Sequence, residues 1–308
     1  MKNQITILVP LWDRSEYTLD WIKNNYCSDY NYYFADGSKS DENYDILKNY
    51  NLKNFTYTRF PYDKNHNQYL KKIDKSVSEI DTPYIMICDN DDFINFKGID
   101  KCLKLLNSNK EIDFVSGNIL FIEEKKKGFY LIDQKYEYKK LSDQKNFKNN
   151  MFRMISPYSY VWYSIFKKDF CKEVWGHLLK SSSHFFSMEI FHTQICMSFG
   201  NFKYVDACTY LKRVNPVSRV NKKINDNFYF IKSWLKNDKY LNLQFNLSTK
   251  ELNKILRHYL YYYMGLKIKC NTSLDKPKNN YQNLFQKIYC RYQRFDLNNL
   301  RKFVNDSI

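Results

Sequence analysis

The first half of the chain alternates apolar segments with amphipathic ones, and this alternation constrains the fold more than any other feature. Four segments have the β-branched and aromatic character of strands: Ile5–Pro10, Tyr30–Ala35, Phe55–Phe60 and Tyr84–Cys88. The segments between them have helical spacing: residues 15–27, 42–50 and 66–80. Strands that alternate with helices form βαβ units with right-handed crossovers. We therefore predict an α/β fold, with a mostly parallel sheet and helices on both of its faces.

Beyond Asp92 the pattern is less regular. We expect helices over residues 97–107, from Asp169 onward and over 187–199. We expect strands over residues 112–122, 129–138, 160–166 and 202–211, with a charged hairpin turn at Glu123–Gly128. From about residue 215 the chain is polar and helical in character, over residues 228–234, 250–266 and 281–303. This shift predicts a first part over residues 1–215 and a helical C-terminal region over residues 216–308.

The composition is that of a folded protein without a membrane span. Of the 308 residues, 44% are hydrophobic and 18% are aromatic, which supplies a core and excludes intrinsic disorder. The longest apolar stretches fall well short of the roughly 18 residues that a transmembrane helix needs. The N-terminus lacks a small-residue cleavage site, so we interpret it as a first strand and not as a signal peptide.

The cysteines and the net charge say less about function. Eight cysteines are scattered without a Cys-x-x-Cys pair, and the five histidines form no zinc pattern with them. In a chain of this length they are typical of reduced core residues in a cytoplasmic protein. The net charge of +16 would suit nucleic acid, anionic lipid or a phosphate-bearing substrate. It would equally follow from the Lys-, Asn- and Ile-rich composition that AT-rich codon usage produces.

The sequence Tyr84–Asp92 is the strongest chemical signal in the chain. An apolar strand ends in Asp89, Asn90, Asp91 and Asp92. Carboxylates this close repel one another unless a cation offsets them, and a hard divalent ion that also binds substrate phosphates does so. In open α/β sheets, ligands bind at the carboxyl ends of the strands, which is the position of this cluster. The alternative is a solvated acidic turn.

Two other strand ends carry polar residues. The first strand runs into Pro10, Trp12, Asp13 and Arg14, and the second into Asp36, Gly37 and Ser38. Because the carboxyl ends of parallel strands share one edge, we expect these residues to face the acidic cluster. An aromatic ring to stack, an acid for a base or ribose, and metal-held phosphates together describe a pocket for a nucleoside diphosphate.

The order of these motifs resembles family 2-type glycosyltransferases, which have the GT-A fold and an Asp-x-Asp motif. The resemblance rests on Val9–Arg14, Asp36–Ser38 and Asp89–Asp92, and extends to about residue 215, where Phe202–Arg213 is similar to the family's closing strand. It implies a GT-A-like catalytic domain over residues 1–215. Residues 1–95 would form the nucleotide-sugar-binding half and residues 96–215 the acceptor-binding half.

The resemblance also implies roles for the strand-end residues. Pro10 and Trp12 would line the base and ribose, with Trp12 stacking, and Asp13 would belong to the same donor pocket. Asp36 would accept a hydrogen bond from the base or ribose, and Asp89 would bind on the ribose side. Asp91 would coordinate Mn²⁺ or Mg²⁺ bridging the diphosphate, and Asp92 would either support the metal ligands from behind or be an acid on the acceptor side.

Glu189 is the candidate general base by the same resemblance. It would deprotonate the acceptor hydroxyl as this attacks the anomeric carbon opposite the leaving group, so that the reaction inverts the anomeric centre. The family commonly has an acid pair where this chain has Met188 and Glu189, and an acid where it has Ala35. One acid therefore remains at each of the two positions, Glu189 at the first and Asp36 at the second. The alternative is a glutamate favoured near a helix N-terminus by the helix dipole.

The C-terminal region suggests where the acceptor is found. Lys250–Lys269 and Tyr289–Arg294 combine aromatic stems with cationic tips, which suits a membrane interface. We therefore expect a glycan or lipid-linked acceptor and peripheral association with the inner face of the membrane. A helical bundle with a basic wet face would give the same pattern.

Two other functions compete with glycosyl transfer. The charge and the aromatic residues could serve a nucleic-acid-binding protein, but no RNA-binding motif is present, and we expect no nucleic-acid partner. A phosphohydrolase could use the pair Asp89 and Asp91, but the Asp-x-Asp of that chemistry normally follows the first strand. We therefore predict a metal-dependent glycosyltransferase that uses a nucleotide-diphosphate sugar in surface glycan or glycoconjugate synthesis.

Overall fold

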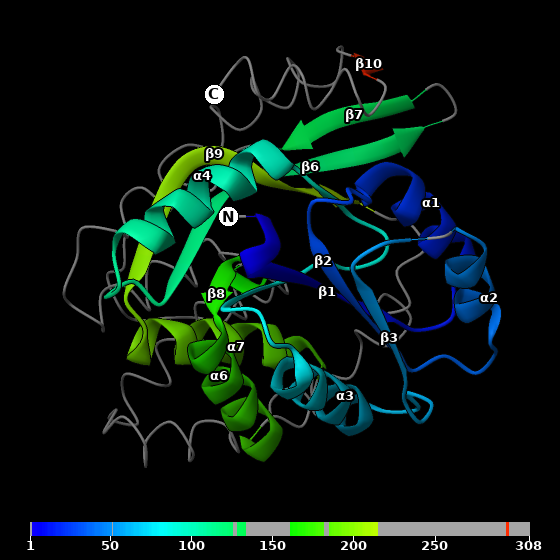
Figure 1. Cartoon of the computed structure of the whole chain (residues 1–308), viewed down its shortest axis with the longest axis horizontal. Helices are drawn as coiled ribbons and strands as arrows, with labels where there is room; N and C mark the ends of the chain where they lie inside the picture. The colour runs from blue at the N-terminus through cyan, green and yellow to red at the C-terminus, as the bar shows by residue number, and fades with distance from the viewer. Residues whose placement is uncertain are drawn as a thin grey trace, which may run out of the picture.

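A computed structural model describes residues 2–50, 52–125, 128–133, 161–181, 185–214 and 294–295 (Figure 1). It has the α/β architecture predicted from the sequence, with a mostly parallel sheet between layers of helices. The boundary near residue 215 and the predicted C-terminal helices lie outside the described residues, apart from Arg294–Phe295.

Four parallel strands form the first half of the sheet, in the order β3-β2-β1-β4. Their bounds are Ile5–Leu11 for β1, Asn31–Asp36 for β2, Phe55–Arg59 for β3 and Tyr84–Ile87 for β4. All seven residues of β1 are buried, because this strand has a neighbour on each side and helices on both faces. The continuous apolar run at the start of the chain is thus explained.

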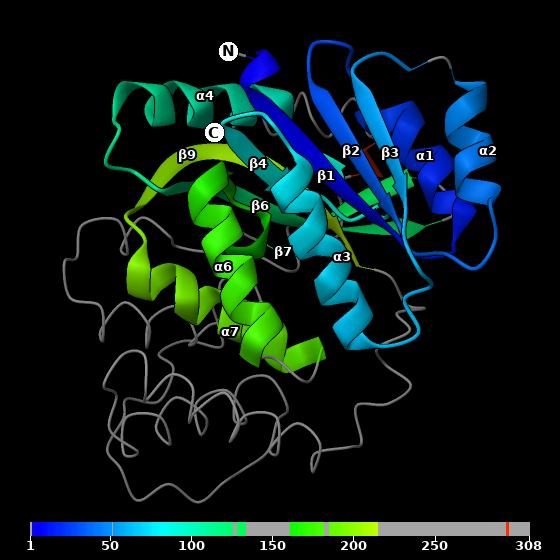
Figure 2. The same ribbon diagram turned by 60° about the horizontal axis from the view of Figure 1, so that its bottom comes forward.

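Helices cover both faces of this sheet (Figure 2). The helices are α1 (Ser15–Asn25), α2 (Glu42–Asn49), α3 (His66–Glu79), α4 (Phe96–Ser108), α6 (Lys168–Ser181) and α7 (Phe185–Phe199). Helices α1, α2 and α4 lie on one face, and α3, α6 and α7 lie together on the other. Helix α3 begins where the side chain of Asn65 accepts a hydrogen bond from the backbone N–H of Gln68 (3.1 Å).

The second half of the chain continues the same sheet with mixed strand directions. The strands are β5 (Phe93–Ile94), β6 (Phe114–Lys125), β7 (Gly128–Asp133), β8 (Ile165–Lys167) and β9 (Phe202–Arg213). Strand β8 pairs antiparallel with both β4 and β6, so that it joins the two halves. Strand β9 runs parallel to β6 and antiparallel to β5, which brings the end of β9 back to the turn after β4.

Two predicted elements differ from the structure. Residues 160–166, predicted as one strand, include a 3-10 turn at Val161–Tyr163 followed by the short strand β8, because the Ser164 N–H bonds back to the Val161 carbonyl (3.0 Å). Arg294–Phe295, within the predicted helix 281–303, form strand β10 (Arg294–Phe295), which pairs antiparallel with β7. The backbone groups at the edge of β7 accept this partner, so residues 281–303 do not form one continuous helix.

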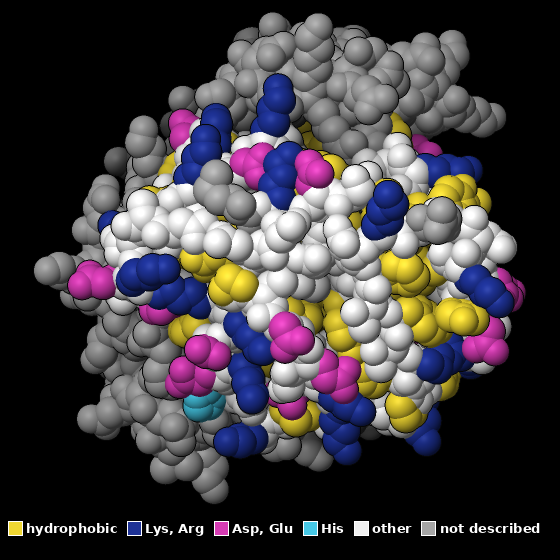
Figure 3. Space-filling model, viewed as in Figure 1, with side chains coloured by type: hydrophobic (Ala, Val, Ile, Leu, Met, Phe, Trp, Pro, Cys, Tyr) yellow, Lys and Arg dark blue, Asp and Glu magenta, His cyan; other side chains and the backbone are white. Residues whose placement is uncertain are grey.

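Charges are mixed on the molecular surface seen in Figure 3. On this face, lysine and arginine side chains alternate with aspartate and glutamate and do not form one basic patch. Within the described ranges, no helix has both the length and the apolar character needed to cross a membrane.

Candidate active site

Three loops meet at the carboxyl edge of the parallel strands. Leu11 at the end of β1 is paired with Asp36 at the end of β2, and Asp36 is paired with Arg59 at the end of β3. On the other side of β1, the Cys88 N–H bonds to the Leu8 carbonyl (3.0 Å) and so aligns the end of β4. The three strand-end motifs found in the sequence are therefore neighbours, at the edge of the sheet where open α/β proteins bind ligands.

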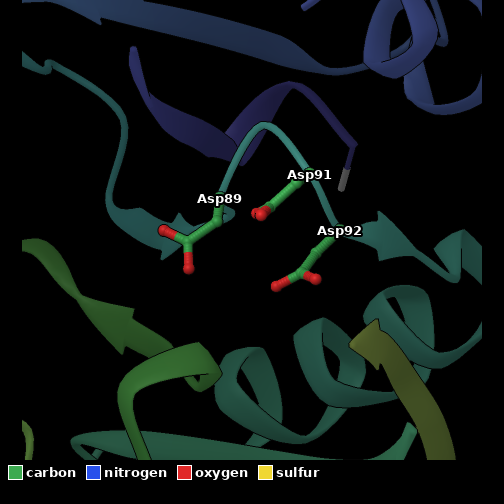
Figure 4. A group of neighbouring side chains, drawn as sticks. All are labelled: Asp89, Asp91 and Asp92. Atoms are coloured by element: carbon green, nitrogen blue, oxygen red, sulfur yellow. The ribbon is translucent and has the colours of Figure 1, made fainter. Parts of the chain in front are cut away.

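The acidic cluster lies on the turn after β4. One carboxylate oxygen from each of Asp89, Asp91 and Asp92 lies within 4.8 Å of the other two. Figure 4 shows the three side chains turned to the same side of the loop. Carboxylate oxygens are the ligands that Mg²⁺ and Mn²⁺ prefer, and one or two of them suffice when substrate phosphates complete the shell. The oxygen donors present therefore fit a single divalent ion.

Two tyrosines orient the carboxylates of Asp89 and Asp92. The Tyr163 hydroxyl donates to Asp89 Oδ2 (2.8 Å), and the Tyr210 hydroxyl donates to Asp92 Oδ2 (2.8 Å). The two rings stack, with centroids 4.1 Å apart and an interplanar angle of 17°. The Arg213 N–H donates to Asp92 Oδ1 (2.7 Å), so both oxygens of Asp92 are bound by the protein. Asp92 is 1% exposed, and of the two roles suggested by the sequence, support of the metal ligands and an acid on the acceptor side, these bonds favour the first.

Lys212 places a cation beside these acids. Its Nζ lies 3.4 Å from Asp92 Oδ2 and donates to the Tyr163 hydroxyl (2.5 Å). Burial would lower the pKa of Lys212, but the charges of Asp92, Asp89 and Glu189 outweigh burial and raise it. Sequence reasoning missed Lys212, Tyr163 and Tyr210. Alternation along the closing strand, which puts residues 210 and 212 on one face, was the available signal.

The pKa values of the acidic cluster show how closely its charges interact. The pKa of Asp92 is raised to about 7, chiefly by burial and also by the negative charges of Asp91 and Asp89, while Lys212 opposes the shift. Burial also raises the pKa of Asp89. The cluster therefore favours the uptake of positive charge, either as a proton or as a metal ion.

Arg14 pairs with the third acid. Its Nη2 lies 2.7 Å from Asp91 Oδ2, and the two side chains are 27% and 20% exposed. Asp13 and Arg14 both have left-handed backbone conformations, with φ of 52° and 61°. The Asp13 N–H donates to Ser38 Oγ (2.7 Å), and Asp13 Oδ1 accepts from the Lys39 N–H (2.9 Å), so Asp13 ties the loop after β1 to the loop after β2.

Asp36 has a different environment from the one expected. Its side chain is fully buried. Oδ1 accepts from the Ser38 N–H (2.8 Å), while Oδ2 accepts from the Tyr57 hydroxyl (2.8 Å) and from Arg59 Nη1 (3.0 Å). Asp36 therefore fixes Arg59, whose side chain is 33% exposed at the strand edge, and does not itself face the crevice.

The glycine at this strand end is required by close packing. A Cβ atom at Gly37 would lie 2.4 Å from the carboxylate carbon of Asp63. Asp63 is held there by the buried ammonium of Lys72, which also donates to the Leu11 carbonyl (2.9 Å). The Asp-Gly-Ser turn and the end of β1 thus share one buried support.

Two further predicted donor-pocket residues lie at the end of β1. Pro10 is buried within the strand, where it is paired with Ala35. Trp12 follows the strand directly and is partly exposed at the carboxyl edge. Of these two, Trp12 is therefore the one with surface available to a ligand.

Glu189, the predicted general base, lies far along the chain from the acidic cluster but affects the same neighbouring residues electrostatically. It lies on α7 and is partly buried. Its negative charge adds to those of Asp92 and Asp89 in raising the pKa of Lys212. Burial and the charges of Asp89, Asp92 and Glu189 together raise the pKa of Tyr163. The Glu189 carboxylate is therefore close enough to Lys212 and Tyr163 for its charge to affect both.

Comparison with known families agrees with this geometry. Residues 6–170, or 165 of the 308 residues, match the family model described as glycosyl transferase family 2. The chain belongs to glycosyl transferase family 2. A search of curated protein sequences gave no match.

Solved structures of glycosyltransferases share the fold of this family 2 glycosyltransferase. S. aureus TarS 1–349 in complex with UDP-GlcNAc superposes with a TM-score of 0.59 at 14% identity, over 85% of this chain and 73% of that chain. The mannosyltransferase PcManGT from Pyrobaculum calidifontis, in complex with GDP-Man and Mn²⁺, gives a TM-score of 0.52 at 12% identity, over 85% and 70%. At such identities the likeness shows the GT-A fold.

Membership of family 2 decides among the functions considered from the sequence. The chain is a glycosyltransferase, and neither the nucleic-acid-binding nor the phosphohydrolase interpretation is needed to explain the acidic cluster. The cluster follows the fourth strand of the sheet, as the resemblance implied.

Proposed function

We propose that this enzyme is a metal-dependent, inverting glycosyltransferase that moves a sugar from a nucleotide-diphosphate sugar to an acceptor hydroxyl. The observation that carries the proposal is the group of three aspartates at the carboxyl edge of the sheet, beside the loops after β1 and β2. The UDP-GlcNAc of one structural neighbour and the GDP-Man and Mn²⁺ of another support this class of donor. The product would belong to a surface glycan or glycoconjugate.

The loops after β1 and β2 would bind the nucleoside. Trp12 is partly exposed and would stack on a base, and Pro10 would line the pocket from within β1. Asp13 would contact the ribose from the loop after β1, which it ties to the loop after β2. Asp36 would act through Arg59, because its own oxygens are bound by the protein.

Asp91 and Asp89 would hold Mn²⁺ or Mg²⁺. The ion would supply Lewis-acid stabilisation of the negative charge that builds on the leaving diphosphate. Tyr163 keeps Asp89 oriented for this purpose, and Asp92 keeps the turn closed through its bonds to Tyr210 and Arg213. Lys212 adds a permanent positive charge at the same place.

Glu189 would act on the acceptor. Its carboxylate accepts the hydroxyl proton while the acceptor oxygen forms a bond to the anomeric carbon and the bond to the diphosphate breaks. Because the attack comes from the face opposite the leaving group, the anomeric centre inverts. Proton removal by a positioned carboxylate contributes a factor of about 10²–10⁴ to the rate.

The assignment of the metal is tested by Asp91→Ala. We expect transfer with Mn²⁺ and a panel of UDP-, GDP- and CMP-linked sugars to fall by at least about 10²-fold in this variant, and EDTA to stop the wild-type enzyme. Asp81→Ala, which removes a fully exposed acid before β4, at the opposite end of that strand from the cluster, is the matched control. Wild-type activity in Asp91→Ala would contradict the metal assignment.

The assignment of the base is tested by Glu189→Gln. This variant should bind the sugar nucleotide as tightly as the wild type while its kcat falls by about 10²–10⁴. An NMR spectrum of the wild-type product, recorded before mutarotation, should show the anomeric configuration opposite to that of the donor. Equal turnover in Glu189→Gln would remove this residue from the mechanism, and retention would exclude single displacement.

The acceptor would be a glycan or a lipid-linked glycan at the inner face of the membrane. This part of the proposal is supported by the basic and aromatic residues of Lys250–Lys269 and Tyr289–Arg294. Co-sedimentation of the full chain with vesicles that contain anionic lipid, and not with neutral vesicles, is the expected result. Binding that is absent from both kinds of vesicle would contradict membrane association.

A further inference from the structure

Arg14 has no role in the reaction proposed above, yet it contacts the acid assigned to the metal. Its guanidinium donates to Asp91 Oδ2 at 2.7 Å and lies 4.1 Å from the centre of the Tyr17 ring. Among the described residues, Arg14 is the hydrogen-bond partner found for Asp91, whereas Asp89 and Asp92 are held by tyrosines. Asp91 is therefore the acid of the cluster whose carboxylate partner is a cation and not a tyrosine hydroxyl.

The backbone around Arg14 is held in an uncommon conformation. Asp13 and Arg14 are consecutive non-glycine residues with φ of 52° and 61°, a region that such residues rarely adopt. Such conformations persist only while surrounding contacts maintain them. On one side these contacts are the bonds between Asp13 and the loop after β2, and on the other the ion pair with Asp91. Loss of that ion pair would allow the turn to move.

The charges of the cluster show which cation a metal ion would replace. With all three aspartates ionised, the cluster carries −3, and Arg14 and Lys212 together carry +2. Lys212 is fixed between Asp92 and the Tyr163 hydroxyl. Arg14 is bound to Asp91 itself, so a divalent ion at Asp91 meets a cation of the protein at the same carboxylate. Two cations so close repel each other strongly.

We propose that Arg14 is a counter-ion that occupies Asp91 in the metal-free enzyme and is displaced when a divalent ion binds. The inference rests on the proposed function for the place of the ion. The displaced guanidinium stays at the carboxyl edge, where its planar group of donors matches the oxygens of a diphosphate. The metal ion alone therefore binds weakly, and the metal ion and the nucleoside diphosphate bind cooperatively.

Binding of Mn²⁺ to the full-length protein tests the competition without turnover. The EPR signal of free Mn²⁺ gives the affinity of the wild type and of Arg14→Gln at fixed ionic strength. We expect Arg14→Gln to bind Mn²⁺ about tenfold more tightly, since the ion no longer displaces a partner of Asp91. Lys23→Gln removes one positive charge from an exposed position on α1 and should leave the affinity unchanged. The double variant Arg14→Gln with Asp91→Asn should lose the gain.

The predicted cooperativity is measured by thermal unfolding with Mn²⁺, with UDP and with both. In the wild type, the joint increase in Tm should exceed the sum of the separate increases, and this excess should shrink in Arg14→Gln. Association of Mn²⁺ with UDP in solution is the same for both proteins and cancels in the comparison. Tm without ligands, together with the circular dichroism spectrum, shows whether Arg14→Gln is folded.

Several results would overturn the inference. Unchanged or weaker Mn²⁺ affinity in folded Arg14→Gln would mean that Arg14 does not compete with the ion. Absence of Mn²⁺ binding from both proteins would also overturn it. Failure of the proposed function is recognised separately, since it would appear as transfer that survives EDTA or Asp91→Ala. The Mn²⁺ titration does not depend on either result.

Discussion

Glu189 and His192 lie less than one turn apart on α7, yet their surroundings are opposite. The negative charge of Glu189 helps to raise the pKa of Lys212, whereas His192 is buried against the rings of Trp162 (4.9 Å between centroids), Phe166 (5.6 Å) and Trp175 (5.9 Å). Burial lowers the pKa of His192 to about 3. Neighbouring positions on one face of the helix therefore carry a candidate base and an uncharged histidine buried in the core.

This buried histidine makes stability depend on pH. In the unfolded chain His192 takes up a proton near its ordinary pKa of 6.5, but in the folded protein it stays neutral down to about pH 3. The unfolded state thus binds more protons below pH 6.5, and stability falls as the pH falls. Between pH 7 and pH 5, we expect the wild type to lose about 2 kcal/mol of unfolding free energy more than His192→Phe. Urea denaturation at both pH values measures the difference, and equal losses would contradict it.

Tyr163 supports the proposed metal site through its hydroxyl group. Its hydroxyl accepts from Lys212 and donates to Asp89, while its ring stacks on Tyr210. Tyr163→Phe keeps the ring and removes the bond that orients Asp89. We expect Mn²⁺ affinity, measured by EPR, to fall by about 10–100-fold, as for other groups that support metal ligands. Tyr33→Phe, which removes a hydroxyl bonded to Thr58 away from the cluster, should have no effect.

At the scale of elements, α4 packs directly on the strand that closes the site. A Cβ atom at Gly98 would lie 1.8 Å from the Cys208 carbonyl oxygen, so only glycine allows this approach. The strand concerned, β9, carries Tyr210 and Lys212 a few residues further on. A shift of α4 would therefore move β9, and with it Tyr210 and Lys212, which contact the acidic cluster.

Gly98→Ala should destabilise the protein strongly, because the added methyl group meets backbone and not a movable side chain. We expect a loss of about 3 kcal/mol or more in unfolding free energy by urea denaturation. Gly176→Ala on α6 is the matched control, since a Cβ atom there would meet nothing within 4 Å. It should leave stability unchanged or raise it by up to about 1 kcal/mol. Similar losses in both variants would show that the packing against Cys208 is not the cause.

At the scale of the whole molecule, Arg213 joins the two halves predicted from the sequence. It pairs with Asp20 of α1 and, at 3.2 Å, with Glu124 of β6, and its guanidinium lies 4.6 Å from the centre of the Phe93 ring. Its side chain is 5% exposed. One residue at the end of β9 thus connects the first helix, the long strand of the second half and the turn that carries the acids.

The substitution Arg213→Gln should remove these ion pairs and ring contacts. We expect a loss of about 2–3 kcal/mol in unfolding free energy, because both carboxylates lose a buried partner and the ring contacts are lost as well. Lys2→Gln, which breaks the exposed ion pair with Asp29, should cause no measurable change. A loss in Lys2→Gln equal to that in Arg213→Gln would assign the effect to net charge. Thermal unfolding of the three proteins at one salt concentration provides the comparison.

The sequence by itself determined the family, the α/β fold and the location of the acidic cluster. These features are local, because a buried apolar run such as Ile5–Pro10 forms a central parallel strand and polar residues after such strands must share one edge. Asp89 and Asp91 were found in this way, and so was Trp12.

Only the tertiary structure decided what each of these side chains contacts. Arg14 meets Asp91 across 77 positions in the sequence, Tyr163 meets Asp89 across 74, and the Arg213 N–H meets Asp92 across 121. Asp36 was predicted to contact the base or ribose, and Asp92 to support the metal ligands or lie on the acceptor side; partners from the protein take up both oxygens of each. A carboxylate at a strand end has no local preference between a ligand and a partner from the protein. That choice depends on how distant strands and helices pack around it, which periodicity and composition do not encode.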